Sequence, residues 1–306
     1  YLDVLEAEGL LEVATAAMRR VQELNRVVRV RFEAGAVPRF DILRVQAELA
    51  QAREQLISAQ NALALARAAF NMLLGRDITT PVHLSKLDSP PPAPASLTAV
   101  GAERQLLDLA YAQRPDIQAA RKGVELARER LKLARAERNP MVNLVADFHR
   151  QTATGLRAAE SKSAMLVVQM PIFDSGRVNA QIEEAKANLD SARQQLTALE
   201  QQVALEVKQA ILNWRSAKER YESARAVLKQ AEEAYRIAQL RYESGVGTNV
   251  EVLDTQVALT RARTNYVRAL HDLHRAYADL DYAVGKPVEQ VLAELALRTA
   301  QLKPKQ

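Results

Sequence analysis

Residues 31–75 read RFEAGAVPRFDILRVQAELAQAREQLISAQNALALARAAFNMLLG, and residues 241–285 read RYESGVGTNVEVLDTQVALTRARTNYVRALHDLHRAYADLDYAVG. The two stretches align without a gap at an offset of 210 residues. Identical glycines lie in the internal turns, where Gly35 aligns with Gly245, and at the last position of each stretch, where Gly75 aligns with Gly285. Because a repeat sets the architecture of a chain, we expect a duplicated unit made of a helix, a tight turn with glycine and a second helix.

Apolar residues in the arms of this unit recur at alternating steps of three and four positions. The longest arm without Pro or Gly runs from about residue 178 to residue 243, with its apolar positions between Ile182 and Tyr242. At 1.5 Å per residue it is a rod of roughly 90–100 Å, far longer than the usual helix of about 11–12 residues. The pattern predicts a coiled coil or part of a helical tube, although the core of an ordinary bundle would also explain it.

The composition supports long helices and excludes several classes of protein. The chain has 306 residues, of which 48% are hydrophobic but only 5% aromatic, and it has no Cys. Without Cys it has no disulfides, thiolate zinc sites or cysteine catalysis. No uncharged apolar run approaches the roughly 18–20 residues of a membrane-spanning helix. The net charge of +5 is spread over interleaved acids and bases without a basic block, so we expect no nucleic-acid partner.

Residues 141–172 have a different period. A helix predicted to begin at Pro115 ends at Asn139-Pro140. Apolar and polar residues then alternate over 142–148 and again over 164–172. The pattern predicts two strands of about nine residues, a length that crosses a bilayer when tilted. A β-hairpin of a soluble domain would show the same alternation of apolar and polar residues, but a hairpin between long helical rods is hard to bury in a globular domain.

These features divide the chain into six segments. The Pro-rich stretch DSPPPAPAS at 88–96 predicts a stiff extended connector, and a short helix is expected at 289–300. The predicted segments are a first helical hairpin (1–75), a linker (76–102), a helix leading to the strands (103–139), the β-hairpin (140–173), a second helical hairpin (174–285) and a C-terminal helix with a tail (286–306).

Taken together, these stretches resemble the TolC-like outer-membrane efflux protein family. The matching phrases are RFEAGAVPRFDIL and RYESGVGTNVEVLD at the turns, RPDI before a helix, and MPIFDSGR at residues 170–177. The resemblance implies a mainly α fold of long antiparallel coiled-coil helices, internally duplicated, with one transmembrane-type β-hairpin. It further implies a homotrimer whose strands form a barrel in the outer membrane of a Gram-negative cell and whose helices form an α-helical barrel in the periplasm.

The resemblance also implies a function. The chain would be an outer-membrane channel, the passive exit duct of a tripartite efflux pump or a type I secretion system. Its partners would be outer-membrane lipid, a periplasmic adaptor and, indirectly, an inner-membrane transporter. It would not be an enzyme and would need no cofactor. Tyr1 would lie in the helix after a first hairpin, with a signal sequence, the first helices and the first two strands outside this chain.

Two other classes of protein stay open. A periplasmic adaptor also carries a helical hairpin, but adaptors have one hairpin, and the duplicated arms argue against that class. A coiled-coil scaffold without transport activity would have no strand hairpin at 141–172.

The turns supply the first candidate site. A glycine is expected at the end of a helix where the backbone turns left-handed. In the family these turns form the periplasmic tip on which the adaptor docks, and a plain helix–helix turn is the alternative interpretation. The matching positions are Gly35, Ala36 and Val37 in the first turn and Gly245, Val246 and Gly247 in the second.

The second candidate site is a gated pore entrance. Glu251 and Asp254 lie three residues apart and share one helix face. In a trimer each would form a ring of three carboxylates, an arrangement that attracts cations. The resemblance places this pair at the acidic periplasmic entrance, Asp41 at a gating position and Tyr242 in the constriction. The acids could instead stabilise the N-termini of their helices, and Tyr242 also belongs to the coiled-coil seam.

No other site is predicted. His271 and His274 lie three residues apart on a helix and could bind a metal. Since no third ligand accompanies them, we expect a surface pair and no metal site. No phosphate-binding loop or nucleophile motif is present in the sequence, so no catalytic residue is predicted.

Overall fold

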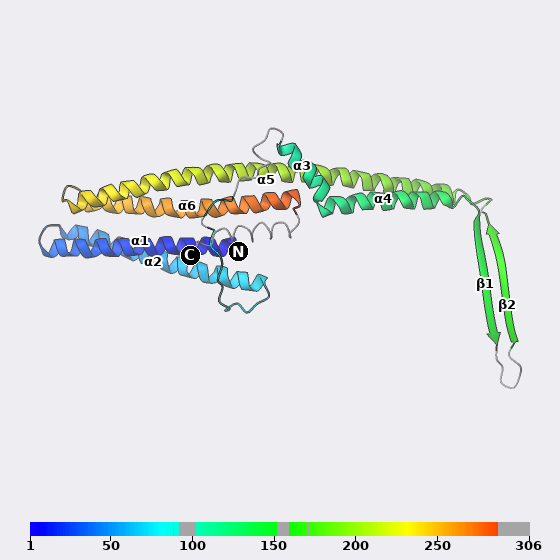
Figure 1. Ribbon diagram of the computed structural model, residues 1–306, viewed down its shortest axis with the longest axis horizontal. Helices are drawn as coiled ribbons and strands as arrows, with labels where there is room; N and C mark the ends of the chain where they lie inside the picture. The colour runs from blue at the N-terminus through cyan, green and yellow to red at the C-terminus, as the bar shows by residue number, and fades with distance from the viewer. Residues whose placement is uncertain (88, 92–101, 152–158, 171, 287–306) are drawn as a thin grey trace, which may run out of the picture. The chain divides into compact units, whose positions relative to one another are not determined.

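The computed structural model describes residues 1–87, 89–91, 102–151, 159–170 and 172–286 (Figure 1). It divides into two compact units: residues up to Leu106 together with those from Glu206 onward, and residues Leu107–Leu205. The fold is mainly α with a single β-hairpin among the described residues, as the sequence predicted. Its elements are α1 (Leu2–Glu33), α2 (Arg39–Leu73), α3 (Ala102–Gln113), α4 (Pro115–Ala136), β1 (Met141–Gln151), β2 (Ala159–Gln169), α5 (Arg177–Glu243) and α6 (Asn249–Val284).

The first unit contains two helical hairpins, α1–α2 and the second half of α5 with α6. Helix α1 packs against both α2 and α6. The apolar positions spaced three and four apart form the predicted seam of each helix. In α5, all of them between Ile182 and Tyr242 are buried or half-buried. The same holds in α6 between Leu259 and Ala283. The seam of α2 is also covered except at its last residue, Leu73, which is 80% exposed. The period of three and four residues therefore identified the packed faces of these helices.

One apolar cluster joins all four helices where the two hairpins turn. Valine and alanine predominate in it, which lets the helix axes approach closely. Its buried members are Val21, Val28, Val45, Ala52, Ala238, Tyr242, Val252 and Leu253. We call this set the tip core.

The duplication is visible in the backbone of the turns. Gly35 and Gly245 have φ of 71° and 79°, the left-handed conformation predicted for them. The next residue closes each turn on a carbonyl five residues back: Ala36 N–H donates to Arg31 O (2.8 Å), and Val246 N–H donates to Arg241 O (3.0 Å). These are the bonds of a Schellman motif. The same hydrogen bonds therefore recur 210 residues apart.

A third glycine sets the spacing between α1 and α6. A Cβ at Gly9 would lie 2.9 Å from Cγ1 of Val267, whereas a Cβ at Gly123 of α4 would meet nothing within 4 Å. We expect Gly9→Ala to lower the free energy of unfolding by about 1–2 kcal/mol because it overpacks this contact. Gly123→Ala should raise the free energy of unfolding by about 0.5–1 kcal/mol, the ordinary helix propensity gain.

Denaturant unfolding followed by circular dichroism checks both values. Adding Val267→Ala to Gly9→Ala should restore part of the loss, since it removes the methyl groups that the new Cβ meets. Stabilisation by both single alanines would contradict the close approach of α1 to α6.

In the second unit, α4 packs against the first part of α5 through an apolar cluster that includes Leu131, Val178, Ile182 and Leu189. Strands β1 and β2 are antiparallel, with Met141 opposite Gln169 and Gln151 opposite Ala159. None of the described helices carries an apolar stretch long enough to cross a bilayer.

The strands differ from their predicted limits. Each has 11 residues instead of about nine, and β2 occupies 159–169 instead of 164–172. The polar residues Glu160–Ser163 pair with Asp147–Arg150, because a ladder is made by backbone groups and does not need apolar side chains. Pairing begins directly after Pro140, which has no N–H to donate. The helix predicted at 289–300 and most of the Pro-rich connector lie outside the described residues.

Candidate functional site

The tip of the first unit brings the two predicted turns to the same end of the paired hairpins (Figure 1). Ala36 is exposed, and Val246 is 73% exposed. Val37 is half-buried against the tip core. The exposed apolar surface of the turns therefore comes from Ala36 and Val246.

The two turns are not identical. Gly247, the repeat equivalent of Val37, adds a further hydrogen bond from its N–H to Arg241 O (2.8 Å). A Cβ at this position would lie 2.9 Å from Cβ of Arg241 and 3.0 Å from its backbone carbon. Gly247 is therefore required by the close approach of the chain to the end of α5, whereas the first turn accommodates a valine.

Tyr242 lies in the tip core and is only 4% exposed. The Arg31 guanidinium stacks 4.2 Å from the centre of its ring, and Arg31 Nη2 donates to the Tyr242 carbonyl (3.1 Å). Burial raises the pKa of the Tyr242 hydroxyl, and the positive charge of Arg31 opposes part of this shift. The hydroxyl has no hydrogen-bond partner among the described residues. Tyr242 thus packs between the hairpins, as its seam position indicated.

Asp41 lies in the first turn of α2, where a negative charge favours the helix N-terminus. Its side chain is half-exposed, and its N–H donates to Pro38 O (3.1 Å). This placement fits both interpretations of Asp41.

Glu251 lies in the first turn of α6, which Thr248 caps: Thr248 Oγ1 accepts a hydrogen bond from the Glu251 N–H (3.2 Å). Arg241 Nε lies 3.5 Å from Glu251 Oε2 across the turn. The carboxylate is thus held next to a cation on its own hairpin.

Asp254 is paired with a cation from the other hairpin. Arg44 Nη2 donates to Asp254 Oδ1 (3.3 Å), and the two side chains are 37% and 68% exposed. Arg44 and Asp254 occupy equivalent positions in the two repeats. The pair therefore bridges α2 and α6 just behind the tip.

Sequence reasoning missed the residues that contact the predicted site. Arg31, Arg44 and Arg241 each contact one of its members, and the aligned repeats already showed Arg44 opposite Asp254 with inverted charge. Phe40, in the first turn of α2, is 64% exposed and adds apolar surface near the tip. In the sequence, Phe40 could have been identified as a large aromatic residue outside the seam.

The prediction of a surface pair at His271 and His274 is wrong. They are 5% and 8% exposed. His271 faces α1 and the segment after α2. His274 Nε2 lies 3.0 Å from Ser89 O. No pattern in the sequence indicates that this segment covers α6.

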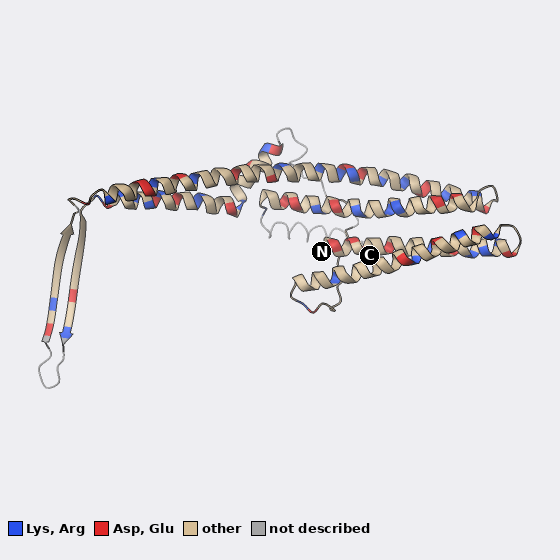
Figure 2. Cartoon of the chain, turned by 180° about the vertical axis from the view of Figure 1, so that it is seen from behind, with Lys and Arg blue, Asp and Glu red and all other residues tan. Residues whose placement is uncertain are grey.

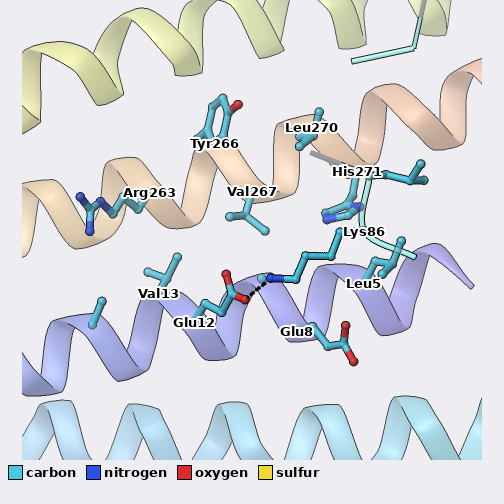
Figure 3. Close-up of a pocket in the computed structure, with 13 residues that line it drawn as sticks. Leu5, Glu8, Glu12, Val13, Lys86, Arg263, Tyr266, Val267, Leu270 and His271 are labelled. Carbon is cyan, nitrogen blue, oxygen red and sulfur yellow. Dashed lines mark hydrogen bonds and ion pairs between the residues drawn. The ribbon is translucent and has the colours of Figure 1, made fainter. Parts of the chain in front are cut away.

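His271 lines a cavity of about 430 Å³ between α1 and α6 (Figure 3). Lys86 reaches across this cavity to pair with Glu12, and Glu8 pairs with Arg67 (2.8 Å). In the part of the chain that the structure describes, no group of three His, Asp or Glu side chains could hold a metal ion.

Comparison with known proteins adds the family. Residues 106–286 match the model described as outer membrane efflux protein. The alkaline protease secretion protein AprF of Pseudomonas aeruginosa is 24% identical over 93% of this chain and 60% of its own length. The outer membrane efflux protein BepC of Brucella suis is 26% identical over 100% of this chain and 65% of its own length. The chain thus spans about three fifths of the length of these relatives.

Solved structures share the fold. The outer membrane protein VceC from Vibrio cholerae superimposes with a TM-score of 0.74 at 22% identity, over 93% of this chain and 67% of VceC. The MtrE outer membrane channel of Neisseria gonorrhoeae, solved in an open state, gives 0.74 at 22% identity, over 93% of this chain and 64% of MtrE. These likenesses confirm the mainly α fold with its hairpin. Because the family match covers more than half of the sequence, the chain belongs to the outer membrane efflux protein family, the TolC-like family that its repeats resemble.

Proposed function

We propose that this protein is an outer-membrane channel, the passive exit duct of a tripartite efflux pump or a type I secretion system. The observation that carries the proposal is the shared tip: two equivalent hairpins meet in one apolar core and present Asp41, Glu251 and Asp254 beside it. The membership of the family, whose members are channels, supports the same conclusion.

Assembly is part of the proposal. Exposed apolar side chains remain on α2, at Leu43, Ile57 and Leu65, and on α5, at Leu212, Ile237 and Leu240. Two different faces of one protomer can join head to tail, and such contacts close into a ring when the rotation allows. We propose a homotrimer in which α2 and α5 contact neighbouring copies, with the β-hairpin in outer-membrane lipid.

The adaptor and the transporter have separate places in this arrangement. Ala36, Phe40 and Val246 give the tip an exposed apolar surface, which suits the helical hairpins of a periplasmic adaptor. Gly35, Val37, Gly245 and Gly247 set the shape of the turns beneath it. The inner-membrane transporter would act through the adaptor and supply the energy. The six sequence segments given above are proposed as the working division of the chain.

Gating follows from the contacts between hairpins. Two contacts join the first hairpin to the second: Arg31 contacts Tyr242, and Arg44 contacts Asp254. Moving the hairpins apart would break both contacts and leave the Asp254 carboxylate without the neutralising charge of Arg44. Tyr242 would act in this gate through its packing in the tip core.

Reconstitution tests the proposal. The full-length protein, purified from outer membranes, is expected to run as a trimer and to produce stepwise ion currents in planar bilayers. A protein with Pro at Leu144 and at Leu166, which face each other in the ladder, should give no currents because the hairpin cannot pair. A monomer without currents would favour the scaffold, and binding to an outer-membrane channel of this family would favour an adaptor.

A further inference from the structure

A groove of about 1070 Å³ runs along one face of the first unit, with α2 as one wall and α6 as the other. Helix α1 packs against both of these helices and forms the floor of the groove. Between the two ends this floor is apolar, since α1 contributes Leu10, Val13, Ala14 and Ala17 to it. The groove can therefore accept an apolar group on its floor and polar groups at its walls.

Ion pairs between helices lie at both ends of this groove. Toward the tip, Arg44 of α2 pairs with Asp254 of α6, next to the first residues that line the groove. At the other end, Arg275 Nη2 of α6 lies 2.5 Å from Asp3 Oδ1 and 2.6 Å from Glu6 Oε2 of α1. The charged groups at the two ends thus neutralise one another.

Between these ends the two walls carry unpaired charges of opposite sign. Arg261 and Arg268 line the groove from α6, and Glu48 and Glu54 line it from α2. None of the four side chains forms an ion pair within 4.0 Å with any residue that the structure describes. Guanidinium groups and carboxylates therefore lie on opposite walls of one groove without contacting each other.

The local sequence explains why the two arginines are unpaired. Charged residues of both signs occur along the whole of α6 (Figure 2), and many charged residues of the other helices pair with a neighbour three or four residues away. No acid lies at that distance from Arg261. The one acid at that distance from Arg268 is Asp272, which pairs with Arg275 (3.1 Å). Both guanidinium groups are therefore available to a ligand.

The arginines share a helix face with Asp254. The residues Asp254, Arg261, Arg268 and Arg275 follow one another at steps of seven, and such a row drifts around a straight helix by only about 20° per step. In the proposed channel Asp254 borders the lumen. The groove therefore opens into the same lumen.

We propose that this groove binds zwitterionic, peptide-like substrates on their way through the channel. The anionic group of the substrate contacts Arg261 and Arg268, its cationic group contacts Glu48 and Glu54, and its apolar part covers the floor. The inference rests on the proposed function. Charges of both signs on opposite walls match such a substrate and disfavour a molecule with one sign of charge. Because the contacts are open to water, binding is weak enough for the substrate to leave.

Block of the ion current tests this inference. The full-length protein is reconstituted in planar bilayers at low salt, and a short end-blocked peptide with one glutamate and one lysine side chain is added. It should block at lower concentration than the matched peptides in which alanine replaces either charged side chain. Arg261→Gln with Arg268→Gln should raise its half-blocking concentration about threefold or more, and so should Glu48→Gln with Glu54→Gln. At about 1 M salt, where the screening length is about 3 Å, these differences should disappear.

A matched control removes the same charge elsewhere in the unit. Arg215 and Arg220 are exposed residues of α5 that do not line the groove, and replacing both with Gln should leave the half-blocking concentration unchanged. Block by either singly charged peptide as strong as that by the zwitterionic one would overturn the inference. Unchanged block in the Arg261 and Arg268 variant would also overturn it, although the currents themselves would still support a channel. No current from the wild-type protein would instead contradict the proposed function.

Discussion

Replacing Glu251 and Asp254 together with Ala is expected to lower the preference of the channel for cations over anions by about threefold or more at low salt. In a trimer the two positions supply six carboxylates. In water, the interaction energy between one carboxylate and an ion about 10 Å away is about 0.4 kcal/mol. A threefold change in selectivity corresponds to a free-energy difference of only about 0.7 kcal/mol. Reversal potentials of the full-length protein in planar bilayers under a salt gradient measure the change.

Replacing an arginine beside these acids should change cation selectivity in the opposite direction. Arg44 and Arg241 lie beside Asp254 and Glu251 and offset their charge. Arg44→Gln should therefore raise cation selectivity. The Arg44–Asp254 pair is largely exposed, and such pairs contribute at most about 1 kcal/mol to stability, so the variant alters charge without unfolding the tip.

Two controls accompany these variants. Asp279 is an exposed acid on the same helix, about 38 Å further along it than Asp254, and Asp279→Ala should leave selectivity unchanged. At about 1 M salt the screening length falls to about 3 Å, so all variants should converge. A wild-type selectivity in the double alanine variant, or an equal loss in Asp279→Ala, would remove the pore assignment.

How far the sequence predicted this site depends on the kind of contact. The left-handed glycines and the buried seams followed from local rules, since a Schellman turn and a 3-4 spacing are visible in a short stretch of letters. The long helix α5 was predicted at about 178–243 and runs Arg177–Glu243 for the same reason. Local geometry is thus the part that one sequence reveals.

Contacts between residues far apart in the sequence could not be predicted from such local rules. Arg44 meets Asp254 across 210 residues, and only the alignment of the repeats hinted at it. The burial of His271 and His274 depends on the segment after α2 that covers them, and no pattern on α6 itself reveals such a cover. The pore and tip assignments of single residues came from resemblance to the family.

Gly245→Arg is expected to reduce export by the assembled machine about tenfold or more while trimers persist. The exposed end of the second turn would gain a long cation at the surface proposed for the adaptor, where loss of a central contact weakens binding by about 2 kcal/mol or more. The change also places a side chain at φ 79°, which costs about 1–2 kcal/mol. Complementation of a strain that lacks the channel measures export, and cross-linking measures the trimer.

The far end of α2 provides the control for backbone strain. Gly75 is exposed, has φ 66°, and a Cβ there would meet nothing within 4 Å, so Gly75→Arg imposes the same strain at the opposite end of α2. Val246→Glu changes the tip surface without a positive φ. If adaptor contact is the cause, Gly245→Arg and Val246→Glu should both impair export while Gly75→Arg exports normally. Equal defects in the two glycine variants would instead assign the loss to strain in the turn, and normal export by Gly245→Arg would show that the second turn does not meet the adaptor.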